Sequence, residues 1–206
     1  MTPEMSAIRW LAFGALVWLG SSGCRPTMPA AATAEYVTTE RGAFSVGAAR
    51  VDITPPPGVS MFGHGPGARV AVGHWTRLYC RAFYVEPRDR AEDPVVIVPC
   101  ELPQVSTRLV REAVVRIRSA ATAAGLPAGD VDALARRVIA PRLMVTATHT
   151  HAGPGHFFEN KRLGGATSSH YPGFDPGLVD YLADRIAQAV VLAYRDWSER
   201  VQAAPP

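Results

Sequence analysis

Residues 143–156 read Leu143-Met-Val-Thr-Ala-Thr-His-Thr-His-Ala-Gly-Pro-Gly-His156, an apolar run that leads into two histidines and a Gly-Pro-Gly turn. The run predicts a strand over 142–148, and residues at positions i and i+2 of a strand point to the same face. We therefore expect His149 and His151 to project together where the strand ends, as suits a metal ligand beside a substrate-handling group. A pair of solvated histidines near a turn is the other interpretation.

The residues around these histidines have properties that a catalytic site would use. The hydroxyls of Thr146, Thr148 and Thr150 are candidates for the hydrogen bonds that orient an imidazole ligand. Gly153 and Gly155 lack side chains, so a substrate can approach the backbone closely there. Their amides are also candidate donors to a developing oxyanion. We therefore predict Gly153 and Gly155 to be substrate-binding residues.

The remaining sequence patterns predict the fold class. Strands are predicted over 44–54, 78–86 and 94–101, and helices over 106–124, 130–138 and 176–197. The continuously apolar strand 94–101 is predicted to be central in the sheet. Asp175 followed by Pro176 is typical of a helix N-terminus. The order strand, strand, strand, helix, helix, strand, helix predicts an α/β fold with helices packed on a mixed sheet.

Composition narrows the possible partners. The chain has 206 residues, enough for one domain, and a formal net charge of +3. Its basic residues are scattered and form no stripe with interleaved aromatic residues, so we expect no nucleic-acid binding. Gly and Pro cluster at 54–67 and 152–177, which predicts long shaped loops.

The N-terminus has the features of an export signal over residues 1–24. It ends in Leu19-Gly-Ser-Ser-Gly-Cys24, which resembles a bacterial lipoprotein cleavage box. We expect Cys24 to be the lipidation site and the protein to lie in the bacterial cell envelope, anchored to the membrane surface by lipid. A plain secretory signal and a secreted protein are the alternative. Residues 25–45 are predicted to be a flexible tether and 46–206 the folded domain.

Two further cysteines, Cys80 and Cys100, lie in the predicted strands. An exported protein can pair them in a disulfide. Spacing alone does not decide between that bond and two buried thiols.

The stretch Thr148-His-Thr-His-Ala-Gly-Pro-Gly closely resembles the Thr-His-Thr-His-Ser-Gly-Pro-Gly motif of the neutral/alkaline, non-lysosomal ceramidases. Other parts of the chain are similar to the same family. They are Val46-Gly-Ala-Ala-Arg-Val-Asp-Ile-Thr-Pro-Pro, Met61-Phe-Gly-His, Leu78-Tyr-Cys-Arg-Ala-Phe-Tyr-Val and Gly173-Phe-Asp-Pro. The resemblance covers about 46–200 and implies the N-terminal part of a larger ceramidase-like catalytic domain.

The resemblance implies a zinc amidase that hydrolyses the N-acyl bond of ceramide to sphingosine and a fatty acid. His149 would be a zinc ligand. His151 would be the catalytic residue beside the metal, where it binds the substrate or stabilises the transition state. Zinc would lower the pKa of a water that attacks the amide carbonyl.

The family takes its other zinc ligands, a second His, a Glu and a Tyr, from further along a longer chain. A catalytic zinc site needs at least three protein ligands. The remaining candidates here are His64, which replaces a Tyr of the family, His74, His156, His170, and Glu101, which stands where the family usually has Asp. We expect the sequence to be the N-terminal piece of a longer protein; a complete small relative is the alternative.

Three functions remain open from the sequence. The first is a ceramidase-like amide hydrolase acting on a ceramide-like lipid. The second is a non-catalytic exported lipoprotein that keeps the fold for lipid or partner binding. The third is a different metal hydrolase, in which His149 and His151 are joined by a local carboxylate such as Glu101, Glu159 or Asp175.

Overall fold

The computed structural model describes residues 42–65, 69–90, 93–160 and 173–203. The predicted signal with Cys24, nearly all of the predicted tether and the candidate ligand His170 lie outside these residues. The first strand begins at Phe44, so regular structure starts two residues before the predicted domain boundary at 46.

Four strands form one mixed sheet in the order β1-β2-β3-β4. They are β1 (Phe44–Asp52), β2 (Tyr79–Pro87), β3 (Val95–Cys100) and β4 (Leu143–Ala147). The pairs β1–β2 and β2–β3 are antiparallel, whereas β3–β4 is parallel. A parallel pair needs a long crossover, and here two helices supply it. The predicted α/β fold with a mixed sheet is therefore confirmed, and β3 is central as expected.

The helices are α1 (Thr107–Ala123), α2 (Ala128–Arg137), the short 3-10 turn η1 (Ala140–Arg142) and α4 (Pro176–Ala203). Ser106 caps α1, because its Oγ accepts a hydrogen bond from the Leu109 amide at 3.1 Å. Asp175 caps α4 in the same way through the Leu178 amide, at 3.2 Å. The start of α4 is thus as predicted, but the helix continues past Trp197 to Ala203.

Helix α4 packs closely on strand β1 because Gly47 has no side chain. A Cβ atom at Gly47 would lie 2.2 Å from the Ala193 carbonyl oxygen and 2.3 Å from the Trp197 amide nitrogen. The Trp197 ring packs against the buried Tyr84 at 5.0 Å between centroids, and its Nε1 donates to Ser45 at 2.8 Å. These contacts hold the longest helix flat against the sheet.

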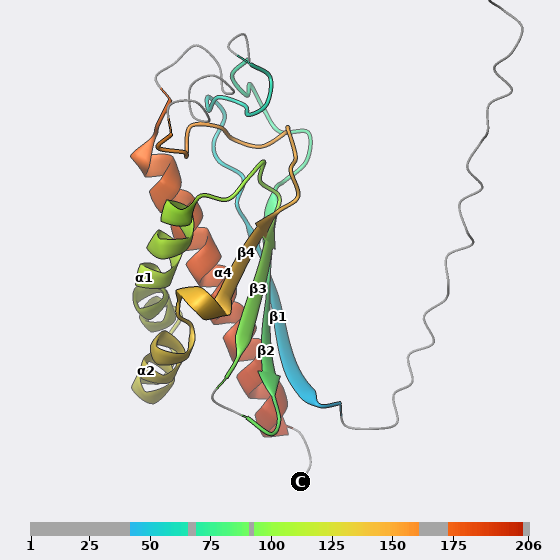
Figure 1. Cartoon of the computed structure of the whole chain (residues 1–206), viewed down its shortest axis with the longest axis vertical. Coiled ribbons are helices and arrows are strands. Elements are labelled where there is room, and N and C mark those ends of the chain that lie inside the picture. The colour runs from blue at the N-terminus through green and yellow to red at the C-terminus, as the bar shows by residue number, and fades with distance from the viewer. Residues whose placement is uncertain (1–41, 66–68, 91–92, 161–172, 204–206) are drawn as a thin grey trace, which may run out of the picture. The chain divides into compact units, whose positions relative to one another are not determined.

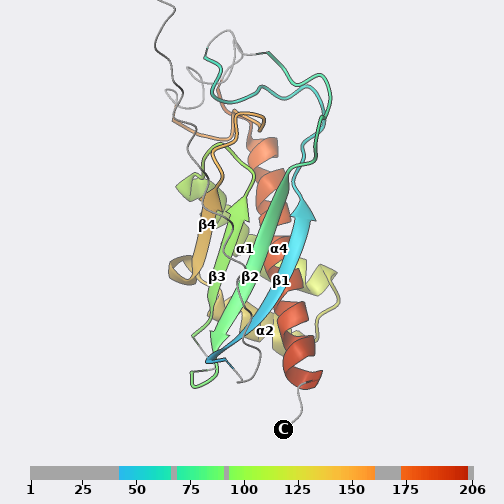
Figure 2. The ribbon, with the colours of Figure 1, turned by 90° about the vertical axis from the view of Figure 1, so that its right-hand side faces the viewer.

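The helices α1, α2 and α4 all cover the same face of the sheet (Figure 1). Figure 2 looks onto the other face, where the strands lie in front of the helices. Alternate residues of β3 follow this division: Val96 and Val98 are fully buried, whereas Val95 and Ile97 are exposed. Each of the four strands has exposed apolar side chains on this open face: Phe44, Val46, Phe83, Val95, Ile97 and Met144. The polar residues Arg50 of β1 and Thr146 of β4 are exposed on the same face. The continuous apolar run of β3 is therefore covered by described residues on one face and not on the other.

Cys80 of β2 and Cys100 of β3 face each other in the antiparallel register and are joined by a disulfide, with their Cα atoms 4.1 Å apart. Both are fully buried. The structure thus favours the disulfide over two free thiols. Among the described residues, no helix combines the length and the apolar character that crossing a bilayer requires.

Candidate functional site

The candidate site lies beyond the carboxyl ends of β3 and β4. The loop after β4 and the loop after β1 meet at this end of the sheet (Figure 1). The Phe62 amide donates to the Gly153 carbonyl at 3.2 Å, and the Gly155 amide donates to the Ser60 carbonyl at 2.7 Å. These bonds join residues 60–62 to the Gly-Pro-Gly turn, so two segments far apart in the sequence form one surface.

The loop after β1 starts from a fixed turn. The Asp52 carboxylate accepts a hydrogen bond from the Thr54 amide at 2.8 Å, and hydrogen bonding from Thr54 lowers the pKa of Asp52. The Tyr181 hydroxyl of α4 donates to the Thr54 carbonyl at 2.9 Å. Both the sheet and the longest helix therefore anchor the segment that leads to His64.

His149 is held by the segment that follows β3. Its amide donates to the Leu102 carbonyl at 3.0 Å, and its Nδ1 lies 2.7 Å from the Pro103 carbonyl oxygen. A carbonyl oxygen only accepts, so Nδ1 carries the proton and Nε2 keeps its lone pair in the neutral ring. This is the second hydrogen bond that a metal-ligating histidine normally makes.

The two histidines come together by a turn rather than by strand alternation. Strand β4 ends at Ala147, and His149 has a φ of +61°, in the left-handed region. The rings of His149 and His151 are nonetheless adjacent, with centroids 5.2 Å apart and planes near perpendicular at 78°. The predicted juxtaposition is confirmed, but the reason differs from the one the strand pattern gave.

His151 packs against the loop after β1. Its ring lies 6.4 Å from the Phe62 ring and 5.7 Å from the His64 ring, both in edge-on arrangements. Nε2 of His64 lies 3.0 Å from the His151 carbonyl oxygen, so this nitrogen is the donor. His64 therefore joins the site, but its Nε2–H is already engaged in a hydrogen bond to the backbone of His151.

The two glycines of the turn are buried. A Cβ atom at Gly153 would lie 3.1 Å from Cδ of Pro103, so a side chain there would press on the segment that holds His149. The Gly155 amide is already bonded to Ser60. Both residues shape the site in this structure, and their predicted contact with substrate stays a prediction.

The candidate carboxylates are bound elsewhere. Glu101 accepts from the Tyr79 amide at 3.0 Å and pairs with Arg81 at 2.7 Å. Glu159 pairs with Arg108 at 2.5 Å, and Asp175 caps α4. Among the described residues, none of these carboxylates is grouped with His149 and His151 as a metal-binding set, as a local-carboxylate metal hydrolase requires.

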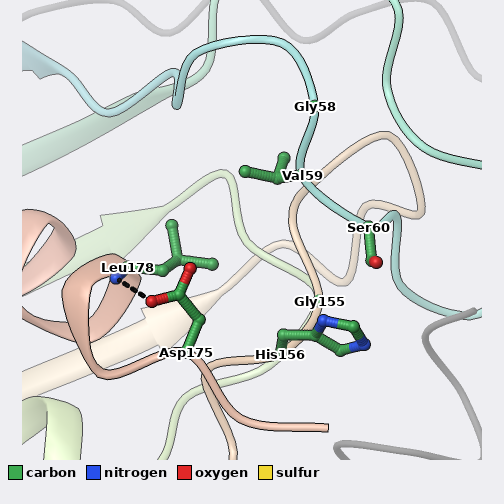
Figure 3. A pocket seen from close by; sticks show the side chains of 7 residues that line it. All are labelled: Gly58, Val59, Ser60, Gly155, His156, Asp175 and Leu178. Atoms are coloured by element: carbon green, nitrogen blue, oxygen red, sulfur yellow. Dashed lines mark hydrogen bonds between the residues drawn. The ribbon is translucent and has the colours of Figure 1, made fainter. Parts of the chain in front are cut away.

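His156 lines a neighbouring cavity of about 230 Å³ together with Ser60 and Asp175 (Figure 3). In Figure 3 the Asp175 carboxylate accepts a hydrogen bond from the Leu178 amide, and the His156 ring points away from that carboxylate. The three residues therefore do not form a Ser-His-Asp relay, although they share a cavity. The remaining described histidine, His74, lies exposed in the loop after β1.

A complete metal site is not present in the part of the chain that the structure describes. Within residues 42–65, 69–90, 93–160 and 173–203, no three His, Cys, Asp or Glu side chains are grouped as metal ligands. The hydrogen bond of His149 Nδ1 to a backbone carbonyl fits a zinc ligand that binds through Nε2. His64 is bonded to a backbone carbonyl in the opposite sense, through Nε2. The donor set therefore fits zinc in part, and further ligands are needed.

Two contributors to the site were not identified from the sequence. The Pro103 carbonyl orients His149, and backbone carbonyls carry no residue-specific signal. Gly63 lies directly beneath the His151 ring. The glycine is visible in the sequence, but its contact is long-range and follows from the meeting of two loops.

Comparison with known proteins agrees with this arrangement. Residues 44–201 match the family described as neutral/alkaline non-lysosomal ceramidase, N-terminal. The structure is similar to the neutral ceramidase of Pseudomonas aeruginosa, with a TM-score of 0.56 and 22% identity over 76% of this chain. It is also similar to a structure described as ceramidase complexed with C2, with a TM-score of 0.54 and 22% identity over 75% of this chain. The matches cover 22% and 21% of those chains, so the chain spans about a fifth of their length.

Proposed function

Because the chain belongs to the neutral/alkaline non-lysosomal ceramidase family, we propose that it forms part of a zinc-dependent amide hydrolase. The substrate class is a ceramide-like lipid, whose N-acyl bond is cleaved to sphingosine and a fatty acid. The observation that carries the proposal is the hydrogen bond from His149 Nδ1 to the Pro103 carbonyl, at 2.7 Å. That bond leaves Nε2 as the nitrogen able to bind a metal.

His149 is the proposed zinc ligand. The Pro103 carbonyl and the Leu102 carbonyl hold its side chain and its backbone, so little rotamer freedom remains to be lost when a metal binds. When bound, zinc supplies Lewis-acid activation of water and of the amide carbonyl.

His151 is the proposed catalytic residue, because its ring is 5.2 Å from that of His149 and exposed to solvent. From this place an imidazole N–H can donate to the substrate carbonyl oxygen as negative charge develops on it. Gly153 and Gly155 are proposed to bound the substrate position through the shape of their turn.

We propose that the remaining zinc ligands come from residues outside the described part of the chain. A single imidazole does not hold a catalytic zinc, which takes three protein ligands. We also propose that residues 1–24 direct export and that a lipid on Cys24 would hold the site at a membrane surface, where a ceramide-like substrate resides.

Zinc titration of the purified 206-residue chain tests the ligand role. We expect His149→Ala to weaken zinc binding by at least tenfold, because the prepared imidazole is lost. His74→Ala is the matched control, since it removes an exposed histidine from a loop, and it is expected to leave zinc binding unchanged. Isothermal titration calorimetry against a competing chelator measures both variants.

Hydrolysis of a short-chain ceramide, with and without zinc, tests the reaction class. Equal zinc affinity in His149→Ala and His74→Ala would contradict the ligand assignment. Zinc-independent hydrolysis would contradict the proposed chemistry. If the chain binds ceramide but neither zinc nor a detectable product is found, the non-catalytic lipoprotein becomes the better description, because the described residues contain no three-ligand group.

A further inference from the structure

The side chain of His151 rests on the backbone of Gly63. A Cβ atom at Gly63 would lie 2.5 Å from Nδ1 of His151, 2.6 Å from its Cε1 and 2.8 Å from its Cγ. These separations are far shorter than the contacts that neighbouring heavy atoms adopt. The ring and a side chain at position 63 therefore cannot occupy this space together.

The other glycines of the same loop are different. Gly63, Gly58 and Gly65 all have positive φ, at +86°, +105° and +71°. Nothing lies within 4 Å of a Cβ atom built at Gly58 or Gly65. A substitution at any of these three glycines strains the backbone. Of the three, only Gly63 is placed so that the added Cβ atom would collide with the His151 ring.

The direction of the His151 ring depends on this contact. No described residue makes a hydrogen bond to its ring nitrogens among those the structure gives, whereas His149 has the Pro103 carbonyl. The His151 ring rests on Gly63, makes near-perpendicular contacts with the Phe62, His64 and His149 rings, and is otherwise exposed. Among the described residues, packing rather than a hydrogen bond therefore sets its orientation.

The loop that carries Gly63 is itself fixed relative to His151. The Phe62 amide donates to the Gly153 carbonyl at 3.2 Å, and His64 Nε2 donates to the His151 carbonyl at 3.0 Å. The residues on both sides of Gly63 are therefore bonded to the segment that carries His151. A shift of the ring cannot be absorbed by moving the loop away without breaking these bonds.

We propose that Gly63 is a positioning residue for His151: its missing side chain forms the seat that turns the imidazole toward His149. The importance of this seat for catalysis rests on the proposed function, but the seat itself does not. Substitution of Gly63 by alanine then moves the His151 ring and leaves His149 attached to Pro103.

A double-mutant cycle in the full chain tests the seat. Gly63→Ala and Gly65→Ala are each made in the native background and in His151→Ala, and folding equilibria are measured by urea denaturation. We expect Gly63→Ala to lower the folding equilibrium constant about tenfold more than Gly65→Ala, and His151→Ala to remove that excess. Gly65→Ala, which carries the backbone strain alone, is expected to show no coupling to His151.

Side-chain NMR of the histidines gives a readout that general destabilisation does not move. At one fixed pH, the His151 Cε1–H signal is expected to shift in Gly63→Ala and to stay in place in Gly65→Ala, with His74 as the internal reference. An unmoved His151 signal in Gly63→Ala overturns the proposal. The proposal is also overturned if Gly63→Ala and Gly65→Ala lose the same stability, both with His151 present and in the His151→Ala background.

The cycle remains decisive if Gly63→Ala does not fold. The proposal then requires Gly63→Ala/His151→Ala to fold, because the clashing ring is gone, and failure of that double variant overturns it. Neither measurement uses zinc or ceramide. A negative zinc titration therefore does not contradict the role of Gly63, and the absence of coupling between Gly63 and His151 does not contradict the role of His149 as a zinc ligand.

Discussion

The two faces of the sheet differ in what covers them, although the strands supply apolar side chains to both. On one face, residues such as Tyr84, Val96 and Val98 are fully buried under α1 and α4. On the other, Phe83 and Ile97 are 37% and 36% exposed, and Met144 is 55% exposed. These apolar side chains on the open face therefore keep contact with solvent that their counterparts on the covered face have lost.

The described part of the chain thus contains one complete layer pairing, with helices packed on one face of the sheet. The histidine site lies at the end of the same sheet, and it too has a prepared side, His149, and a part for which the described residues give no ligands. The covered face therefore carries the stability of the described fold, and the open face should contribute little of it.

The sharpest test compares one truncation on each face. Leu182 of α4 is fully buried in the core on the covered face, so Leu182→Ala is expected to lower the free energy of unfolding by about 2–5 kcal/mol. Ile97→Ala removes a partly exposed side chain from the open face and should cost about 1 kcal/mol or less. Urea denaturation measures both, and equal losses would mean that the open face is covered in solution.

The disulfide tests whether the covered layer depends on a covalent link. Cys80 and Cys100 are fully buried and 20 residues apart in sequence. Replacing both by alanine is expected to destabilise the fold by roughly 3 kcal/mol, mainly because the unfolded chain gains freedom. A reducing agent should lower the thermal midpoint of the native chain and leave that of Cys80→Ala/Cys100→Ala unchanged. No effect of reduction on the native chain would show that the bond adds nothing.

Much of the fold could be predicted because its signals are local. The cap at Asp175, the presence of the main helices and strands, and their succession along the chain all follow from neighbouring residues. The open face could not be predicted in this way. An apolar run such as β3 has the same pattern whether one face or two are covered by the rest of the chain. The packing of the helices on one face decides which residues are buried.

The site was predictable in part for the same reason. His149 and His151 stand out in the sequence and do come together, but through the positive φ of His149 rather than through strand alternation. The carbonyl of Pro103 and the seat at Gly63 come from segments distant in the chain. Such contacts depend on how loops meet, and spacing along one segment does not encode that.

The smallest expected effect concerns a bond that ties the covering helix to the edge of the sheet. Asp196 of α4 accepts a hydrogen bond from the Ala48 amide of β1 at 2.9 Å and pairs with Arg200 at 2.9 Å. Hydrogen bonding to Arg200, and then to the Ala48 amide, lowers the pKa of the Asp196 carboxyl. The lowered pKa means that the folded chain holds the carboxylate form more strongly than the unfolded chain does.

That stabilisation is therefore present above the unfolded pKa, near 4, and is lost as the pH falls through the folded value. At pH 7, Asp196→Asn is expected to lower the free energy of unfolding by about 1 kcal/mol or less, since the pair is partly exposed. The difference between the two proteins should shrink as the pH falls from 5 toward 2, as denaturation at each pH would measure. Glu199→Gln, on the same helix with a looser pair to Arg195 at 3.9 Å, is the control and should have almost no effect at pH 7. A constant Asp196→Asn difference across this range would mean that the Asp196 charge does not hold α4 to β1, and that packing around Gly47 alone keeps the covered face closed.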